Sequence, residues 1–120
     1  MKEKRKAKRV AVVEKFAFCV SVPRLGATKL KVIDVSDMGI GFDVDTLGEF
    51  RLQKDEKSKL QFYVNQSLYL ELEIQVVRLQ ETDGTQNVGA VFLNTQSATY
   101  KTFLTLVSLI DQLAEHGELA

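Results

Sequence analysis

Two arginines and a short acidic segment are the residues in this chain whose types and spacing best suit ligand binding. Arg5 and Arg9 lie four positions apart near the N-terminus, and each guanidinium offers a planar cationic fork that fits phosphate oxygens. Residues 34–39 read Asp-Val-Ser-Asp-Met-Gly, which supplies a carboxylate, a hydroxyl and a stretch of bare backbone. In combination the two segments predict a receptor for a ligand that carries both phosphate and a nitrogenous base.

The basic residues of the chain are concentrated at its N-terminus. The 120 residues have a formal net charge of zero, but residues 2–9 hold six Lys or Arg against one acid, Glu3. The remainder therefore contains ten basic and fifteen acidic residues. A basic arm on an acidic body attracts anions locally, whereas the acidic body itself has no general affinity for nucleic acid. Residues 1–9 have little to bury, so we expect a flexible arm.

The composition indicates one soluble globular domain, with 45% apolar and 27% charged residues. Cys19 is the only cysteine, so no intramolecular disulfide can form. Glu14 and Lys15 interrupt the apolar residues where a signal-peptide core would lie, and no apolar run is long enough to span a membrane. These features predict a cytoplasmic protein. The single His and Cys and the lack of a nucleophile–base pair predict a non-enzyme with no metal or cofactor.

Apolar residues alternate with polar ones after the arm, which predicts six β-strands with turns between them. The alternating sets are Phe16, Phe18, Val20 and Val22; Leu30 and Val32, continuing to Val35; Ile40, Phe42 and Val44; Leu60, Phe62 and Val64; Leu68, Leu70, Leu72, Ile74 and Val76; and residues 88–93. Residues 34–39 therefore connect the second strand to the third. The alternation slips by one between Val76 and Val77, which predicts a β-bulge or sharp bend. Asp83-Gly84 predicts a hairpin turn.

Six strands with little helix predict a closed or nearly closed antiparallel β-barrel. At residues 97–116 the spacing becomes that of an amphipathic helix, with Ser97 as its N-cap. The helix has a broad apolar stripe, which is typical of a buried helix but could also meet a partner or form a homodimer. The residues that widen it are Leu106, Leu109 and Leu113. The predicted organisation is an arm over residues 1–9 and a barrel domain over residues 10–120.

The sequence resembles the PilZ domain family, bacterial receptors for cyclic di-GMP. The residues that carry the resemblance are Arg5 and Arg9, then Asp34, Ser36 and Gly39 within VIDVSDMGIGF. The later segments VVR (residues 76–78) and VGAVF (residues 88–92) and the closing helix are also similar to the family's pattern. The resemblance implies a six-stranded antiparallel β-barrel with a C-terminal helix, in agreement with the periodicity.

The resemblance also implies that five residues contact cyclic di-GMP: Arg5, Arg9, Asp34, Ser36 and Gly39. Arginine can fork onto phosphate and pair with guanine O6 and N7, whereas Lys4 and Lys8 would give weaker electrostatic support. The Asp34 carboxylate would accept from guanine N1–H and the exocyclic amine. The Ser36 hydroxyl would bond guanine or tighten the turn, and Gly39 would let the backbone approach the ligand.

The expected function is therefore a free-standing cyclic di-GMP receptor whose arm folds over the ligand and signals to a downstream protein. Motility, adhesion or exopolysaccharide control are the outputs that the resemblance suggests. One alternative is a protein-interaction module that binds no nucleotide, and another is a nonspecific nucleic-acid binder that uses the arm. Gly41 is expected to serve the following strand, and Asp43 and Asp45 to be solvated.

Overall fold

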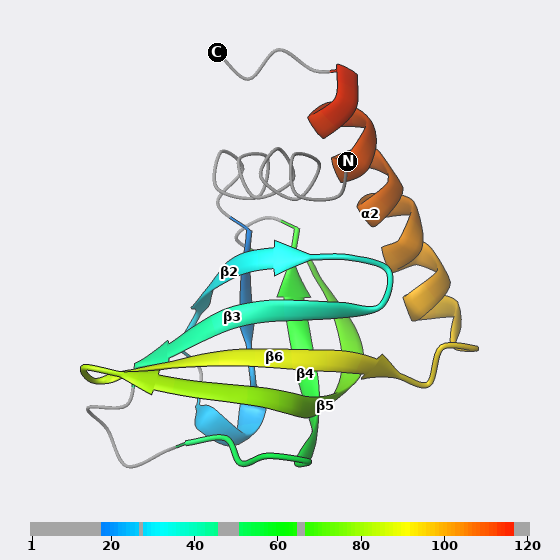
Figure 1. Ribbon diagram of the computed structural model, residues 1–120. Helices are drawn as coiled ribbons and strands as arrows, with labels where there is room; N and C mark the ends of the chain where they lie inside the picture. The colour runs from blue at the N-terminus through cyan, green and yellow to red at the C-terminus, as the bar shows by residue number, and fades with distance from the viewer. Residues whose placement is uncertain (1–17, 27, 46–50, 65–66, 117–120) are drawn as a thin grey trace.

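Six antiparallel strands close into a barrel in the order β1-β2-β3-β6-β5-β4, as the alternation predicts (Figure 1). The computed structural model describes residues 18–26, 28–45, 51–64 and 67–116. Its elements are β1 (Cys19–Ser21), the 3-10 helix η1 (Pro23–Leu25), β2 (Leu30–Val35), β3 (Gly39–Asp45), β4 (Lys57–Tyr63), β5 (Tyr69–Thr82), β6 (Thr85–Leu93) and α2 (Ala98–His116). Strands β2, β3, β6 and β5 form the face turned to the viewer in Figure 1.

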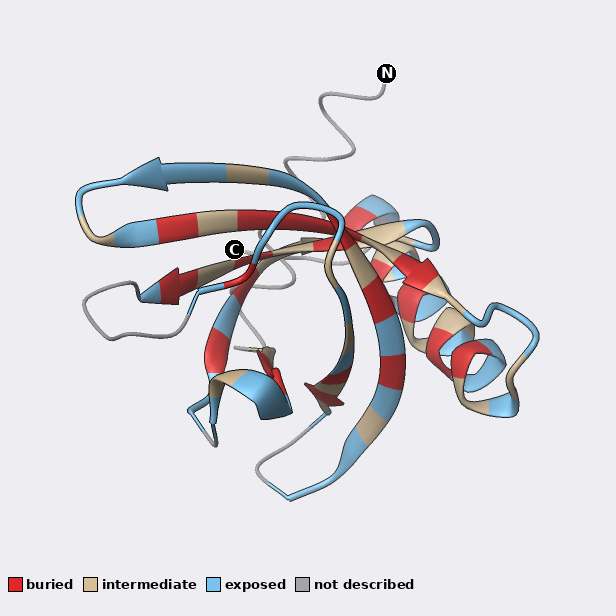
Figure 2. Cartoon of the chain, turned by 90° about the horizontal axis from the view of Figure 1, so that it is seen from below, coloured by how far each residue is buried: buried red, intermediate tan, exposed pale blue. Residues whose placement is uncertain are grey.

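The barrel interior holds the apolar side chains that alternate along the strands. Phe42 and Phe62 are completely buried, and buried bands recur along the strands between exposed ones (Figure 2). Phe16 lies outside the described residues; among the described members of the expected sets, Val64 and Leu68 depart most from this pattern, at 38% and 57% exposed. They lie beyond the end of β4 and before the start of β5, so the inward–outward alternation of a paired strand does not apply to them.

The long β5–β6 hairpin confirms two local predictions. The pairing register shifts between Val76 and Arg78, where the slip in the alternation predicts a bulge. At the tip, Asp83 and Gly84 both have positive φ, 45° and 82°. That combination is typical of a tight hairpin turn whose twist matches the strands.

Helix α2 packs its apolar stripe on one end of the barrel. The Ser97 hydroxyl accepts a hydrogen bond from the Tyr100 N–H at 3.0 Å, which confirms Ser97 as the N-cap. The Phe103 ring is completely buried, with its centroid 5.3 Å from that of Phe62 and 4.9 Å from that of Phe92. Leu109, on the outer part of the stripe, is 51% exposed.

Candidate ligand-binding site

The connection at residues 34–39 is a tight turn that the Ser36 side chain closes. The Ser36 hydroxyl accepts from the N–H groups of Met38 and Gly39, at 3.2 and 3.3 Å. The Ser36 N–H donates to the Gly39 carbonyl oxygen at 2.9 Å. Of the two roles expected for Ser36, tightening the turn is the one that these bonds supply.

Asp34 faces outward because β2 contains a bulge. Val32 pairs with Phe42 and Asp34 pairs with Gly41, so Ile33 is the extra residue on β2. Without it, Asp34 would have the same inward orientation as Val32. One Asp34 carboxylate oxygen accepts from the Val35 N–H at 2.9 Å, which fixes the orientation of the side chain.

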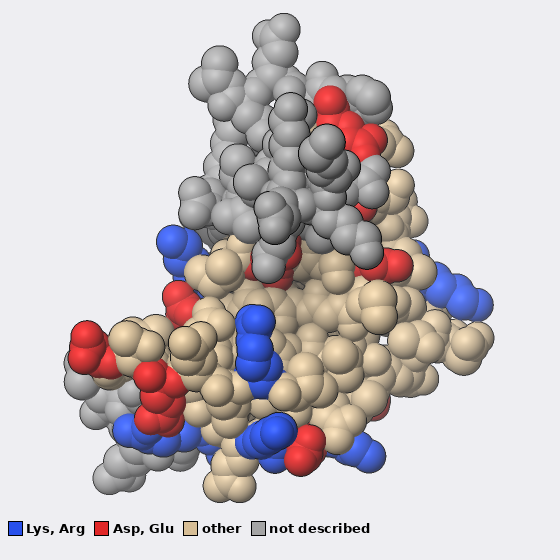
Figure 3. Space-filling view, viewed as in Figure 1, with Lys and Arg blue, Asp and Glu red and all other residues tan. Residues whose placement is uncertain are grey.

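A shallow cavity of about 360 Å³ lies beside this turn, on the outer face of β2, β3, β6 and β5. The residues that line it are Ile33, Asp34, Ser36, Gly39, Ile40 and Gly41 on one side, and Val77, Arg78, Asn87, Gly89 and Ala90 on the other. Figure 3 looks onto this face: one basic side chain (blue) stands in its middle among uncharged atoms, and other charged side chains gather toward the β5–β6 hairpin and the lower edge. The cavity therefore brings together three of the residues expected from the sequence, Asp34, Ser36 and Gly39.

Gly39 and Gly41 both line the cavity, but they differ in the space that a side chain would have. A Cβ at Gly39 would lie 2.4 Å from the Ala90 carbonyl oxygen, so close packing of β3 on β6 requires glycine there. This reason differs from the expected approach of a ligand. A Cβ at Gly41 would meet nothing closer than 3.8 Å. Gly41 lies in β3, as expected, but it also lines the cavity.

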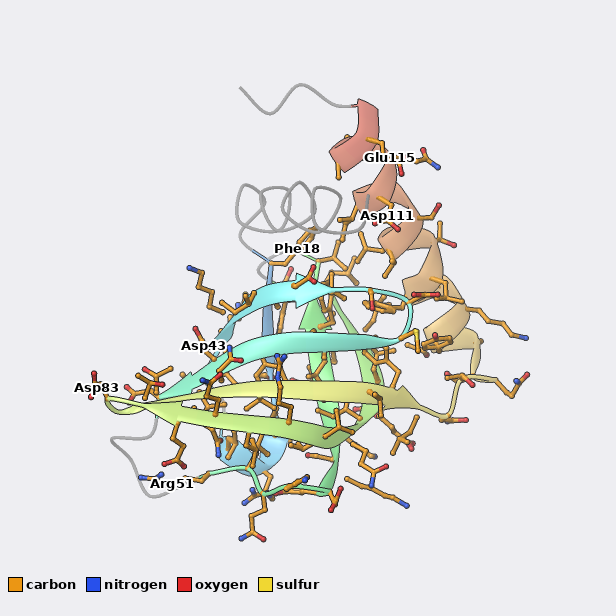
Figure 4. The ribbon with its side chains drawn as sticks, viewed as in Figure 1. Phe18, Asp43, Arg51, Asp83, Asp111 and Glu115 are labelled. Carbon is orange, nitrogen blue, oxygen red and sulfur yellow. The ribbon has the colours of Figure 1, made fainter. Side chains whose placement is uncertain are left out.

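Arg78 and Asn87 are cavity residues that the sequence reasoning missed. The signal for Arg78 was present, because the bulge predicted after Val76 places Val77 and Arg78 together on the outer face. Asn87 joins them only through strand pairing. Its amide donates to the Asp43 carboxylate at 3.0 Å, so the expectation that Asp43 is merely solvated was wrong: it is half-buried and bonded on the outer face of β3 (Figure 4).

The turn is also bonded to elements behind it. The Tyr100 hydroxyl of α2 donates to the Asp37 carbonyl oxygen, and the Phe92 N–H donates to the Met38 carbonyl oxygen at 3.1 Å. Tyr100 is 8% exposed, so its hydroxyl has this partner in a largely dry environment. The candidate site is therefore connected directly to the start of the C-terminal helix.

The other expected site residues, Arg5, Arg9, Lys4 and Lys8, lie outside the residues that the structure describes. Within the described part of the chain, no group of three His, Cys, Asp or Glu side chains is arranged to hold a metal ion. Over the same residues, no helix combines the length and apolar character needed to cross a membrane.

Comparison with known proteins identifies the family. The model of the PilZ domain matches residues 3–109. The chain belongs to the PilZ domain family. A search of curated protein sequences gave no match.

Several solved structures have a similar fold. The PilZ domain of YcgR from Escherichia coli, with c-di-GMP, has a TM-score of 0.62 at 18% identity over 82% of this chain and 83% of that one. A longer YcgR chain in complex with c-di-GMP has a TM-score of 0.60 at 16% identity, and the match covers 82% of this chain and 42% of YcgR. MrkH of K. pneumonia in its apo state has a TM-score of 0.65 at 12% identity over 84% of this chain and 49% of MrkH. The chain thus spans less than half of these two longer relatives.

Proposed function

We propose that this protein is a cyclic di-GMP receptor that binds its ligand over the cavity between β2–β3 and β5–β6. The observation that carries the proposal is the Asp-x-Ser-x-x-Gly turn at residues 34–39, which borders that cavity. Membership of the PilZ family supports the proposal. So does the YcgR PilZ domain, whose similar barrel is described with c-di-GMP.

The turn would read the guanine base. Asp34 is half-buried, and the bond from the Val35 N–H holds its carboxylate at the cavity. A carboxylate only accepts hydrogen bonds, so it complements guanine N1–H and the exocyclic amine and repels phosphate. Ser36 would contribute chiefly by holding the turn, because its hydroxyl already accepts from two backbone N–H groups.

The N-terminal segment would supply the phosphate contacts. In the proposal, residues 1–9 form an arm that closes over the ligand and residues 10–120 form the barrel domain. Arg5 and Arg9 would fork onto phosphate or guanine, and Lys4 and Lys8 would add attraction without a directed fork. In this proposal the protein is a cytoplasmic receptor that is not an enzyme and needs no cofactor.

A downstream protein would sense the change through the arm or α2. Apolar residues between α2 and the β4–β5 connection form an open groove, in which Leu68 and Leu109 are 57% and 51% exposed. We assign this groove to the downstream protein, with motility, adhesion or exopolysaccharide control as the output. A homodimer through α2 would bury the same side chains, so a dimer in analytical ultracentrifugation that Leu109→Ser abolishes would overturn the assignment.

Calorimetric titration with cyclic di-GMP tests the proposal. The wild-type protein should bind, and Arg9→Lys and Asp34→Ala should each weaken binding by about tenfold or more, as expected when a charged hydrogen bond is lost. Asp37→Ala is the matched control, because it removes an exposed carboxylate of the same turn.

Each other result of this titration counts against part of the proposal. No binding by the wild type would favour an interaction module that binds no nucleotide. Affinity unchanged by Asp34→Ala would refute the base-reading role of Asp34. Equal affinity for unrelated single-stranded nucleic acid, with steep loss as salt rises, would favour the nonspecific alternative.

A further inference from the structure

One row of cross-strand partners runs across the floor of the cavity. Asp34 pairs with Gly41, Gly41 pairs with Gly89, and Gly89 pairs with Arg78. The two outer strands both contain a bulge beside this row, at Ile33 in β2 and at Val77 in β5. The bulges place a carboxylate and a guanidinium on the same outer face, with two glycines between them.

The glycine at position 89 leaves space that the Arg78 side chain occupies. A Cβ at Gly89 would lie 3.1 Å from Arg78 Nε and 3.3 Å from Arg78 Nη2. The Arg78 side chain therefore lies across the backbone of β6, over the cavity floor. Any larger residue at position 89 would push the guanidinium away from this place.

Asn87 orients the guanidinium from the next outward position of β6. Its Nδ2 donates to Asp43 at 3.0 Å, and its Oδ1 accepts a long hydrogen bond of 3.5 Å from Arg78 Nη2. A carboxylate can only accept and a guanidinium can only donate. The Asn87 amide therefore has one orientation that serves both neighbours, and Asp43 determines which atom Arg78 meets.

We propose that Arg78 is a further ligand-binding residue of this site, positioned by Asn87 and Gly89, and that it binds acceptor atoms of the nucleotide. The inference rests on the proposed function. The row spans three strand spacings of about 4.8 Å, so about 14 Å separates the two ends along the curved sheet. Because the Arg78 side chain covers Gly89, a planar base over Gly41 would lie between the Asp34 carboxylate and the Arg78 guanidinium.

The two ends of the row have opposite hydrogen-bonding polarity. Asp34 accepts, which suits guanine N1–H and N2, and Arg78 donates in a fork, which suits guanine O6 and N7. Adenine presents an amine where guanine has O6, so Arg78 would favour guanine over adenine. A phosphate oxygen is the other acceptor that an arginine fork fits, and a lysine substitution tests whether the fork or only the positive charge is needed.

Titration of cyclic di-GMP against Arg78→Gln and Arg78→Lys tests the proposal, with Lys57→Gln as the control. Lys57 is an exposed cation of β4 that does not line the cavity. Arg78→Gln should lose about tenfold or more in affinity while Lys57→Gln stays within about twofold of wild type. If Arg78 binds the nucleotide through its bidentate fork, Arg78→Lys should be as weak as Arg78→Gln. If only its positive charge near a phosphate matters, Arg78→Lys should recover most of the affinity.

A double-mutant cycle tests whether Asn87 acts by positioning Arg78. Asn87→Ala should weaken binding about three- to fivefold in the wild-type background and have no further effect beside Arg78→Gln. Gly89→Ala should weaken binding in the same way. Thermal unfolding of each variant checks that the barrel is intact. Additive losses would refute positioning through Arg78.

The role of Arg78 and the proposed function can be refuted separately. If the wild type binds and Arg78→Gln binds equally tightly, the role of Arg78 is refuted and the proposed function stands. If the wild type does not bind cyclic di-GMP, both are refuted.

Discussion

Alanine at Gly39 and at Gly41 should separate a glycine required by packing from one that leaves room for a ligand. Both residues lie in β3, one outward position apart. At Gly39 the added Cβ would lie 2.4 Å from the carbonyl oxygen of Ala90 in the paired strand β6. At Gly41 the nearest atom, the Val88 carbonyl oxygen, is 3.8 Å away, which is ordinary van der Waals contact.

The expected costs differ because of what each Cβ would meet. Overpacking costs about 1–3 kcal/mol, and a backbone carbonyl moves less readily than a side chain. We therefore place Gly39→Ala at the upper end, about 3 kcal/mol, with a fall in Tm on the order of 10 °C. Gly41→Ala should change the free energy of unfolding by less than about 1 kcal/mol, because alanine restricts the unfolded chain without straining the strand.

Urea and thermal denaturation of the two variants measure this difference in stability. Calorimetric titration of the same variants measures their affinity for cyclic di-GMP. Gly41→Ala should remain as stable as wild type and bind cyclic di-GMP more weakly, since its methyl group would occupy the cavity floor. Gly39→Ala should be clearly less stable than wild type. If Gly39→Ala is as stable as wild type, or if Gly41→Ala is the less stable variant, the assignment of Gly39 to strand packing is refuted.

Two further substitutions test contacts that hold the barrel and the turn. Tyr100→Phe should lower the free energy of unfolding, measured in urea, by about 1 kcal/mol. The ring can stay against Phe92 while the hydrogen bond from the hydroxyl to the Asp37 carbonyl oxygen is lost. Equal stability would show that this bond contributes nothing. Gln86 is 2% exposed and bonds both the carbonyl oxygen and the N–H of Leu52, at 2.9 and 3.2 Å. Gln86→Leu should cost about 2 kcal/mol by leaving those groups unpaired, whereas Gln80→Leu on the exposed face of β5 should change stability by less than about 0.5 kcal/mol.

The barrel could be predicted from the sequence because its signals are local. Alternation reports which face of a strand is buried, and Asp83-Gly84 reports a turn through φ values that few other residue pairs accept. The bulge in β5 was predictable because Val77, an apolar residue, breaks the phase visibly. The bulge in β2 was not predicted, because Ile33 is apolar and directly follows Val32, so the alternation is already blurred before Val35.

The candidate site could be predicted only in part, because half of it depends on strand pairing. Asp34 and Gly39 belong to one local motif and were found together. Arg78 and Gly89 reach the same cavity through the register of β6 against β5 and β3. Register depends on the whole barrel, and a single sequence gives no direct measure of it. The same dependence on register explains why the hydrogen bond of Asp43 was not predicted, because its partner Asn87 is a cross-strand neighbour.

The bonds behind the turn limit how strong a binding signal α2 alone can carry. A ligand shifts a conformational equilibrium only by the difference between its affinities for the two states. A neutral hydrogen bond such as that of Tyr100 to Asp37 contributes about 1 kcal/mol, which corresponds to a shift of about fivefold. Each charged hydrogen bond is worth about 1.5–3 kcal/mol. Under the proposed function, closure of residues 1–9 through Arg5 and Arg9 must therefore supply most of the switch, with α2 as the weaker route.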